Sequence, residues 1–427
     1  MKDSGIEWIG EIPEGWKIEN SSQYLKEIKD INIDKKELNA LKFSLGEIVK
    51  KENIKIDNDI LDTLSKYTKV KNHDIIINGL NLEFDFITQR VGLVREYGII
   101  TSAYLSLRPH NIFPQFAVYL LKSYDDCKVF HSLGRGLRKT LTYSELKKVS
   151  LLIPPLAEQQ RIADYLDAKC AHIDHCLELT RQSMEKLRAY KLSCITEAVT
   201  KGLDPDAPLK NSSLWWTPKI PQHWDIEKIG WNFSIELGKM LDSKKLLENN
   251  LYHYLRNIDI KWGEINYNNL PLMSFTDDEK QRFQLKVGDL LVCEGGDIGR
   301  CAIVHNLPDF PVFYQKAIHR VREISKNKIY YLRYILFCMS KNDYFSCTSN
   351  KSTIAHLPAE TFKQLRIPLP PLPEQERIAA YLDKKCARID ALLEEKQALL
   401  DKLAEYKKSL IFECVTGKRE VPSCWNR

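Results

Sequence analysis

The segment from residue 170 to residue 176 contains residue types that bind metal ions. Its five candidate ligands are Cys170, His172, Asp174, His175 and Cys176. Thiolate, imidazole and carboxylate groups one helical turn apart can hold a zinc ion. A second copy of this segment occurs later in the chain, and its matched positions are Cys386, Arg388, Asp390, Ala391 and Leu392. Because most of the ligand types are lost in that copy, we interpret the segment as helix surface and seam, with no metal site.

Two polar loops carry side chains rich in hydrogen-bond donors. Residues 134–140 contain Arg135, Arg138, Lys139 and Thr140. Residues 349–353 contain Asn350, Lys351, Ser352 and Thr353. Further donors in the same two regions of the chain are Gln89, Arg90, Arg256, Asn257 and Arg300. Such donors suit the phosphates and base edges of nucleic acids. Polar loops are common on soluble proteins, however, so taken alone this pattern favours a solvated surface.

Sequence signatures of catalysis are missing. The chain has no Gly-x-Gly-x-x-Gly motif and no Walker loop, and its only Pro-Pro pairs stand before two long proline-free stretches. The Asn/Asp-Pro-Pro-aromatic signature of amino-methyltransferases is therefore absent. Residues 27–29 read Glu-Ile-Lys and fit the end of a nuclease motif, but so short a pattern is expected by chance. These absences disfavour a nuclease or methyltransferase that acts alone.

The elements that would position the polar loops belong to an internal repeat. Residues 153–170 return as residues 369–386, at an offset of 216 that carries Pro154 to Pro370 and Thr200 to Thr416. A second repeat, at an offset of 208, relates residues 8–16 to residues 216–224. A constant offset over this distance indicates a duplicated unit. The predicted order is globular segment, long helix, globular segment, long helix.

Each copy of the repeat predicts one long helix. Neither residues 157–201 nor residues 374–416 contain Pro or Gly, and Gly202 and Gly417 stand where the helices would end. A helix from residue 158 to residue 199 would be roughly 63 Å long at about 1.5 Å per residue. Heptad-like spacing indicates that the two helices bury their apolar stripes against each other. The predicted seam consists of Leu166, Ile173, Leu177, Met184, Leu187, Ile378, Leu382, Ile389, Leu393, Leu400, Leu403 and Leu410.

The two globular segments share anchor residues but not loops. Their β-rich runs align so that Asp74 matches Asp289 and Arg108 matches Arg322. The residues between these anchors are unlike each other. A shared scaffold with different loops indicates two modules that bind different versions of one kind of ligand.

Composition sets the class of protein. The chain has 427 residues, 44% of them hydrophobic and 28% charged, which is ordinary for two or three folded domains. The net charge of +6 permits a polyanionic partner without requiring one. The odd count of 11 cysteines, with no Cys-x-x-Cys pair, favours reduced thiols. No signal-peptide region or transmembrane-length apolar run is found, so we expect a cytoplasmic protein.

The duplicated Pro-Pro-Leu-x-Glu-Gln-x-Arg-Ile-Ala-x-Tyr-Leu-Asp resembles the specificity subunit of type I restriction–modification enzymes. The Ile-Pro-x-x-Trp lead-ins and the Gly-Asp-Leu-Leu run at Gly288 also fit this family, whereas His73 stands at the matching position of the first module. The resemblance implies an α+β fold with two mixed α/β target-recognition domains, an antiparallel two-helix coiled coil between them, and a pseudo-twofold internal repeat. The implied boundaries are 1–153 and 210–369 for the recognition domains, and 154–209 and 370–427 for the helical spacers.

The same resemblance implies a non-catalytic subunit that reads double-stranded DNA, one half of a split site per recognition domain. Its partners would be two methylation subunits docked on the helices, with motor-nuclease restriction subunits added. The subunit would bind no cofactor, because S-adenosylmethionine is expected on the methylation subunits. The alternatives are a DNA enzyme that acts alone and a coiled-coil scaffold that never contacts DNA.

Overall fold

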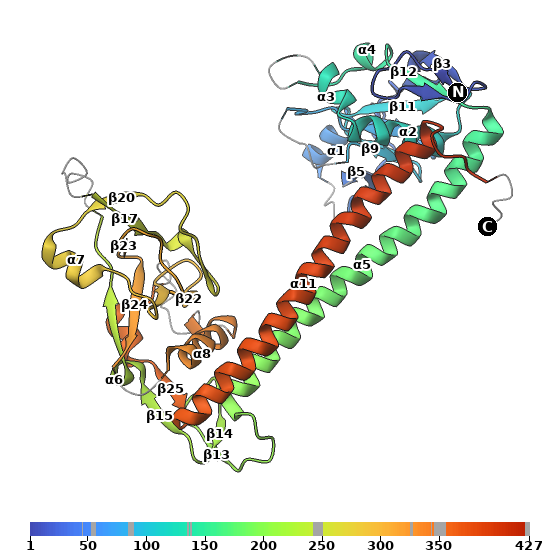
Figure 1. Cartoon of the computed structure of the whole chain (residues 1–427). Helices are drawn as coiled ribbons and strands as arrows, with labels where there is room; N and C mark the ends of the chain where they lie inside the picture. The colour runs from blue at the N-terminus through green and yellow to red at the C-terminus, as the bar shows by residue number, and fades with distance from the viewer. Residues whose placement is uncertain are drawn as a thin grey trace. The chain divides into compact units, whose positions relative to one another are not determined.

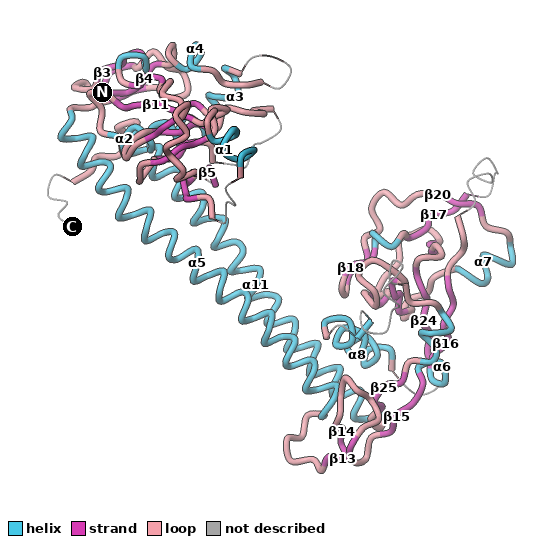
Figure 2. Tube along the Cα trace, turned by 180° about the vertical axis from the view of Figure 1, so that it is seen from behind, coloured by secondary structure: helices cyan, strands magenta, loops and turns pink. Residues whose placement is uncertain are grey.

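The computed structural model describes residues 1–44, 46–52, 57–83, 89–134, 136, 139–241, 251–324, 328–342, 344–345 and 356–422. The chain forms two compact units (Figures 1 and 2). The first unit contains residues 1–181 and 397–427, and the second contains residues 182–396. Each unit consists of one globular module and half of each long helix. We call residues 1–153 the first module and residues 210–369 the second module.

The first module is built on a four-stranded antiparallel sheet in the order β4-β11-β8-β9. The strands are β4 (Leu25–Glu27), β11 (Leu105–Pro109), β8 (Ile75–Ile77) and β9 (Val91–Leu93). Helix α2 (Pro114–Asp126) contributes its apolar face to the same core, and its proline stands at the first turn, where a missing N–H costs nothing. The short helices α3 (Val129–Leu133) and α4 (Tyr143–Leu146) follow.

The second module repeats this sheet in the order β16-β24-β21-β22. The strands are β16 (Phe233–Leu237), β24 (Ile318–Glu323), β21 (Leu290–Cys293) and β22 (Cys301–Ile303). Helix α8 (Ile329–Lys341) takes the place of α2, and α10 (Ala359–Gln364) precedes the long helix as α4 does. The two sheets therefore share strand order, direction and connections, as the duplication predicted.

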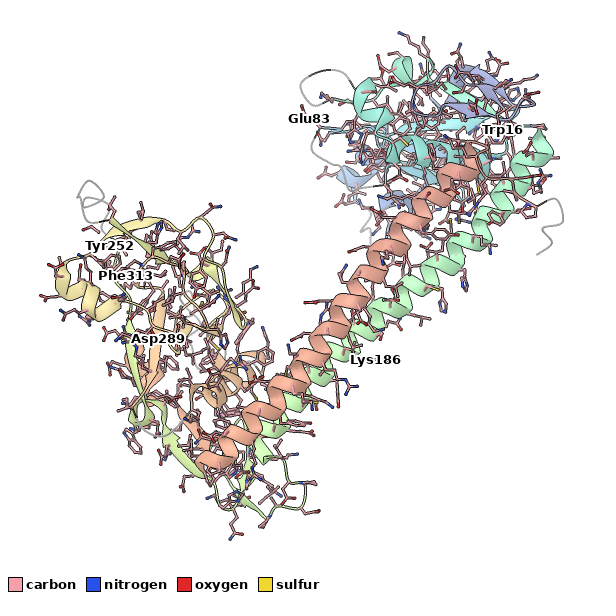
Figure 3. The ribbon with its side chains drawn as sticks, in the orientation of Figure 1. Trp16, Glu83, Lys186, Tyr252, Asp289 and Phe313 are labelled. Carbon is pink, nitrogen blue, oxygen red and sulfur yellow. The ribbon has the colours of Figure 1, made fainter. Side chains whose placement is uncertain are left out.

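The matched anchors form the same ion pair in both sheets. Arg108 lies 2.9 Å from the buried carboxylate of Asp74, and Arg322 lies 2.5 Å from the equally buried carboxylate of Asp289. Each aspartate also accepts a hydrogen bond from a backbone N–H three residues before it. Figure 3 labels Asp289 in the second module. The aspartate thus fixes the turn before a central strand and binds an arginine from the neighbouring strand.

The two modules differ in what they insert between the shared strands. In the first module the additional elements are β5 (Leu41–Ser44), β6 (Glu47–Lys50), α1 (Asn58–Leu64), β7 (Thr68–Val70) and β10 (Gly98–Ile100). In the second they are β17 (Leu251–Leu255), the 3-10 helix η3 (Asn257–Asp259), β18 (Ile260–Lys261), β19 (Glu264–Ile265), β20 (Leu272–Ser274), α7 (Asp277–Phe283) and β23 (Val312–Tyr314). The insertions pack in further cores, and two of these also contain residues of the shared sheet, such as Leu291 in the second module and Ile76 in the first. The modules therefore share the sheet and differ in what packs against it.

Short strand pairs connect each module to the long helices. In the first module β1 (Lys2–Asp3) pairs with β2 (Glu11–Ile12), and β3 (Lys17–Asn20), followed by the 3-10 turn η1 (Ser21–Gln23), pairs with β12 (Ser150–Ile153). In the second, β13 (Leu209–Asn211) pairs with β14 (Lys219–Pro221), and β15 (Asp225–Lys228), which continues into α6 (Ile229–Asn232), pairs with β25 (Arg366–Leu369). The lead-in tryptophans Trp16 and Trp224 are both buried.

The two long helices are α5 (Leu156–Lys201) and α11 (Leu372–Val415). Within the first unit, Lys407 of α11 binds Asp174 of α5 at 2.6 Å. Within the second unit, Lys191 of α5 binds Asp390 of α11 at 2.7 Å. The offset of 216 carries Asp174 to Asp390 and Lys191 to Lys407, so one antiparallel helix contact occurs once in each unit.

Burial is uneven among the residues of the predicted seam, and it is greatest toward the ends of the two helices. Leu166, Leu382 and Ile378 are fully buried, and Ile173, Leu177, Met184, Ile389 and Leu410 are nearly so. Leu187, Leu393, Leu400 and Leu403 are only half-buried. The heptad pattern missed Ile195, Ala198 and Cys386, which pack in the core of the second unit. Those three residues face a globular module as well as the partner helix, and heptad spacing does not report that contact.

Candidate nucleic-acid interface

In the second module, four connecting segments meet at the carboxyl end of strand β21. Glu294 N–H donates to Ala317 O at 3.0 Å, and Lys316 N–H donates to Lys239 O at 2.8 Å. Gln315 N–H donates to Leu255 O at 3.1 Å, which adds the segment after β17. We call these segments, residues 238–241, 256–259, 294–300 and 315–317, the second-module edge. It surrounds a recess of about 280 Å³ lined by Met240, Leu241, Glu294, Gln315, Lys316 and Ala317.

Three of the predicted DNA-binding residues come together at this edge. The Asn257 side chain donates to Gly295 O at 3.0 Å, and Arg300 donates to both the Asn257 backbone oxygen (2.9 Å) and its amide oxygen (2.5 Å). Arg256 forms a bidentate pair with Asp259 at 3.0 and 2.8 Å, and this hydrogen bonding raises the pKa of the arginine. All three polar side chains therefore hold the loops in place, while Arg256 keeps about 41% of its side chain exposed.

The first module has a corresponding edge at the carboxyl end of β8. Leu141 N–H donates to Gly79 O at 2.9 Å, and Leu82 N–H donates to Lys139 O at 3.1 Å. The Lys139 ammonium lies 3.5 Å from the Glu83 carboxylate and remains accessible. Thr140 is half-buried next to Lys139, and Gln89 is exposed. The same edge thus presents a lysine and a glutamine to solvent.

Arg90 does not fit the predicted role as a DNA contact. Its side chain is about 1% exposed, and its guanidinium donates to the carbonyls of Asn78 (3.0 Å), Leu80 (2.7 Å) and Asn81 (3.3 Å). It precedes β9 as Arg300 precedes β22, and both arginines bind backbone carbonyl groups of the adjacent loops. The Arg90 guanidinium therefore holds the loop after β8 in place.

Six predicted residues lie outside the part of the chain that the structure describes. They are Arg135, Arg138, Asn350, Lys351, Ser352 and Thr353. The described residues that flank them do belong to the edges: Lys139 and Thr140 follow the first set, and Gly295 forms an antiparallel bridge with His356 after the second. The described residues that follow the two polar loops therefore lie at the carboxyl end of the matched strand.

The repeated motif also supplies a joint between each module and its helix. Gln375 donates to Pro370 O at 2.8 Å and accepts from Lys328 N–H at 3.0 Å, and Lys328 is the N-cap residue of α8. Gln159 makes the same contacts, with Pro154 O at 2.8 Å and with the N–H of Phe113, the N-cap residue of α2, at 2.8 Å. Each glutamine is almost fully buried and links the proline lead-in to the module's main helix.

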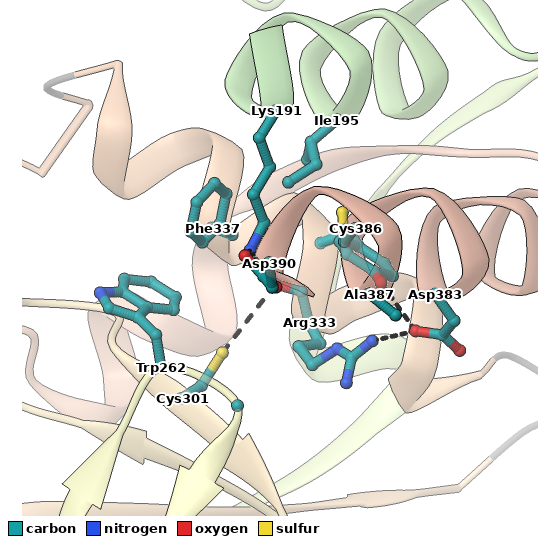
Figure 4. A pocket seen from close by; sticks show the side chains of 12 residues that line it. Lys191, Ile195, Trp262, Cys301, Arg333, Phe337, Asp383, Cys386, Ala387 and Asp390 are labelled. Carbon is teal, nitrogen blue, oxygen red and sulfur yellow. Dashed lines mark hydrogen bonds and ion pairs between the residues drawn. The ribbon is translucent and has the colours of Figure 1, made fainter. Parts of the chain in front are cut away.

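The motif aspartate makes the second contact of this joint. Tyr119 O–H donates to Asp167 at 2.7 Å, and Tyr334 O–H donates to Asp383 at 2.6 Å. Burial, together with the hydrogen bond to aspartate, raises the pKa of both tyrosines, so each remains a proton donor. In the second unit Arg333 also pairs with Asp383, and the pair lines a cavity of about 240 Å³ beside Lys191 and Asp390 (Figure 4).

The candidate metal ligands of residues 170–176 lie in different surroundings. Cys170 is buried in the first unit's core, Asp174 binds Lys407, and His172 and His175 are exposed. Within the described residues, no group of three or more His, Cys, Asp or Glu side chains is placed to hold a metal ion.

The family model described as "Type I restriction modification DNA specificity domain" matches residues 96–189 and 221–402, which is more than half of the chain. The chain belongs to this family. The resemblance drawn from the duplicated motif is thereby confirmed, and so is the α+β fold with two mixed modules and long helices.

Individual relatives of this type I specificity family are similar over most of their length. The specificity subunit of type I restriction enzyme EcoKI from Escherichia coli is 23% identical over 397 residues, covering 88% of this chain and 83% of that protein. The MjaVIII specificity subunit from Methanocaldococcus jannaschii is 23% identical over 405 residues, covering 87% and 86%.

Solved structures show the same fold. A chain from a type I restriction–modification complex, described for its assembly and conformational transition, has a TM-score of 0.76 at 16% identity and covers 96% of this chain and 100% of its own. The HsdS subunit from Thermoanaerobacter tengcongensis has a TM-score of 0.55 at 17% identity, covering 96% and 98%. Within the described residues of this family member, none of the helices combines the length and apolar composition that crossing a bilayer requires.

Acid is expected to weaken the second unit of this type I specificity chain through His319. Its buried imidazole has Nε2 2.7 Å from Leu357 O, and burial lowers its pKa below the ordinary 6.5. The unfolded chain therefore takes up a proton below about pH 6.5 that the folded unit refuses, and stability falls as the pH drops further, by at most about 1.4 kcal/mol per pH unit. Urea unfolding at pH 7.5 and pH 5.5 measures this loss. His319→Gln, which still donates but does not titrate, should show a smaller difference; an equal difference would exclude His319 as the cause.

Proposed function

We propose that this chain is the non-catalytic specificity subunit of a type I restriction–modification complex, and that each module reads one half of a split DNA site. The observation that carries the proposal is the duplicated sheet whose carboxyl-end edges carry unlike loops. One scaffold with two different edges suits a reader of two different half-sites. Family membership supports DNA as the ligand, since the family is defined by DNA specificity.

The charge distribution at the edges agrees with a nucleic-acid ligand. Lys316 and Lys139 are exposed there, and the sequence adds Arg135, Arg138 and Lys351 in the polar loops whose flanking described residues lie at the same edges. Such side chains bind phosphates through charge and read guanine through paired hydrogen bonds. Arg256, half-exposed and held by Asp259, is a further candidate. We expect the two edges to contact half-sites separated by one or more helical turns of about 34 Å each.

The expected division of labour places the chemistry on partner subunits. Methylation subunits would bind S-adenosylmethionine and modify the base, and restriction subunits would join the complex for cleavage. This division of labour follows the family. Specific DNA binding is expected only of the assembled complex. The purified chain alone should show neither methylation nor cleavage.

The first test concerns the polar loops. Arg138→Ala is expected to weaken binding of the assembled complex and to relax specificity in one half-site, by about 1–3 kcal/mol if the arginine reads a guanine. Lys351→Ala should act on the other half-site. If either side chain contacts only phosphate, binding weakens evenly across sequences and the salt slope falls by about one. Affinity is measured on DNA altered in one half-site at a time. Unchanged affinity and salt slope for both variants would move the search to Gln89 and Arg256.

The helices present matching aromatic residues for two identical partners. Tyr190 on α5 and Tyr406 on α11 are each about 49% exposed, and the repeat offset relates them. In the second unit Tyr190 and Tyr381 line a groove of about 720 Å³ together with the segment after α5. Repeated exposed tyrosines are suited to anchor two copies of one subunit, because aromatic residues dominate binding energy at protein interfaces.

The second test concerns docking. Tyr190→Ala should weaken attachment of one methylation subunit and Tyr406→Ala that of the other, each by about 2 kcal/mol, or roughly thirtyfold. The double variant should leave the chain without stably bound methylation subunits. Leu179→Ala is the matched control, since Leu179 is about 51% exposed on α5. The repeat offset relates Leu179 to Glu395, so this apolar side chain is not repeated on α11. Subunit stoichiometry by native mass spectrometry gives the result. Two subunits bound with full affinity in the double variant would place the docking surface elsewhere.

A further inference from the structure

Each module presents one strongly exposed isoleucine within an Asn-Ile-Asp tripeptide. Ile33 is about 77% exposed and Ile258 about 74% exposed. The tripeptides occupy residues 32–34 and 257–259, both in the insertion that follows the first strand of the shared sheet. The repeat offset does not relate them, so they arise separately in the two different insertions. The same small arrangement therefore occurs in the two parts of the chain that differ most.

In the second module, the residues beside Ile258 are held in place. Asn257 is fixed by Gly295 O and Arg300, as described above. Asp259 is about 2% exposed and accepts hydrogen bonds from the Arg256 backbone N–H (2.7 Å) and from the Arg256 guanidinium. Every polar side chain flanking Ile258 thus has its partner inside the protein. Besides the partly exposed Arg256, this turn offers a ligand the isoleucine side chain.

In the first module, Ile33 has an equally firm frame. Asn32 is fully buried, and its amide donates to Glu37 O at 2.8 Å and to Leu64 O at 3.3 Å, while its oxygen accepts from Glu37 N–H at 3.2 Å. Asp34 binds Lys69 at 2.7 Å. Here too the polar neighbours are engaged internally and the apolar side chain faces solvent.

Contacts of the neighbouring residues connect both isoleucine turns to the edges that we propose to face DNA. Asn257 contacts the segment after β21, which places Ile258 at the second-module edge. In the first module Ile31 pairs with Thr68, whose hydroxyl lies 3.1 Å from that of Ser102 in the turn before β11. Strand β11 is antiparallel to β8, so this turn lies at the carboxyl end of β8, where the Lys139 loop also returns.

We propose that Ile33 and Ile258 are specificity-determining residues that contact the 5-methyl group of a thymine, one in each half-site. This inference rests on the proposed function. An exposed, β-branched side chain has few rotamers and loses little freedom on binding. In the major groove the thymine methyl is the apolar feature that such a side chain can recognise. A short isoleucine on a tight turn is suited to contact this methyl group, and the engaged polar neighbours leave it without a competing hydrogen-bonding role.

The test uses the assembled complex and DNA whose half-sites have been established by mapping methylated bases. Each thymine of the two half-sites is replaced in turn by uracil, which removes only the 5-methyl group. For the unaltered complex we expect one position per half-site at which uracil raises Kd about fourfold, the effect of one buried methyl at about 0.8 kcal/mol. Ile258→Ala should weaken binding at least as much and abolish the uracil effect in the second module's half-site only. Ile33→Ala should do the same in the other.

Ile324→Ala is the matched control. Ile324 is about 62% exposed and follows β24, at the end of the same sheet opposite to the second-module edge. It should bind all the DNAs as the unaltered complex does. If Ile258→Ala retains the uracil effect, or if half-sites contain no thymine sensitive to uracil, the inference is wrong. Weaker binding without any uracil effect would indicate an apolar wedge between base pairs and would also overturn it. Failure of the unaltered complex to discriminate DNA at all would instead contradict the proposed function.

Discussion

Replacing Leu382 with aspartate is expected to unfold the second unit's helix pair. The side chain is fully buried in the core where α11 meets α5 and the second module. The substitution removes a leucine, a loss of about 2–5 kcal/mol, and leaves a carboxylate without a partner, which costs several more. The sum is comparable to the whole stability of a domain. Thermal unfolding and amide hydrogen exchange of α11 should both report the loss.

Two further variants keep this prediction decisive. Leu382→Ala, without the charge, should cost about 2–5 kcal/mol and leave a folded chain to measure. Leu392→Asp, ten residues further along the same helix and about 41% exposed, should change stability by less than about 0.5 kcal/mol. The half-buried Leu393 and Leu400 should fall between these limits when changed to aspartate. Equal effects at Leu382 and Leu392 would mean that the helix pair is not held together by this seam.

The second large effect is expected at the two motif glutamines. In Gln159→Ala and Gln375→Ala, a lead-in carbonyl and the N–H of the N-cap residue of the module helix both lose their partner inside the protein. Each orphaned group costs about 1–3 kcal/mol, so each variant should lose about 2–6 kcal/mol. Because the glutamines lie in different units, the losses should add in the double variant.

Urea unfolding of the full chain measures these losses. Gln397→Ala is the control, since Gln397 is exposed on α11 and donates a hydrogen bond to its helix neighbour Asp401 at 3.0 Å. It should remain within about 0.5 kcal/mol of the unaltered chain. A double variant no less stable than either single variant would show that the two joints act as one.

The sequence predicted the repeated scaffold well because the repeat compares each residue with its copy. Asp74 and Arg108 could be aligned with Asp289 and Arg322, and the structure gives both pairs the same ion contact. The helix bounds followed from the absence of proline and glycine between residues 157 and 201. These features depend on local pattern, which a sequence displays directly.

The edges were harder to predict because their polar residues have two possible partners. In the sequence, Arg90, Arg300 and Lys139 are equally suited to contact DNA. In the structure, Arg90 and Arg300 bind carbonyl groups that only the folded loops bring within reach. The i, i+3 spacing of Arg256 and Asp259 did offer a signal for an internal pair, and it was missed. The roles of Gln159 and Gln375 were visible only as repeated letters, since their partners lie 47 residues away in one case and 46 in the other.

The antiparallel helix contact has a consequence for synthesis. Lys407 meets Asp174 across 233 residues of chain, so the first half of α5 leaves the ribosome long before its partner exists. At about 5–20 residues per second the delay is roughly 12–47 s. During that time the stripe of Leu166, Ile173 and Leu177 lacks its helical cover, although the first module is already complete. The apolar stripe of α5 therefore remains without α11 while the second module is synthesised. Any factor that shields this stripe in the interval would raise the yield of folded protein.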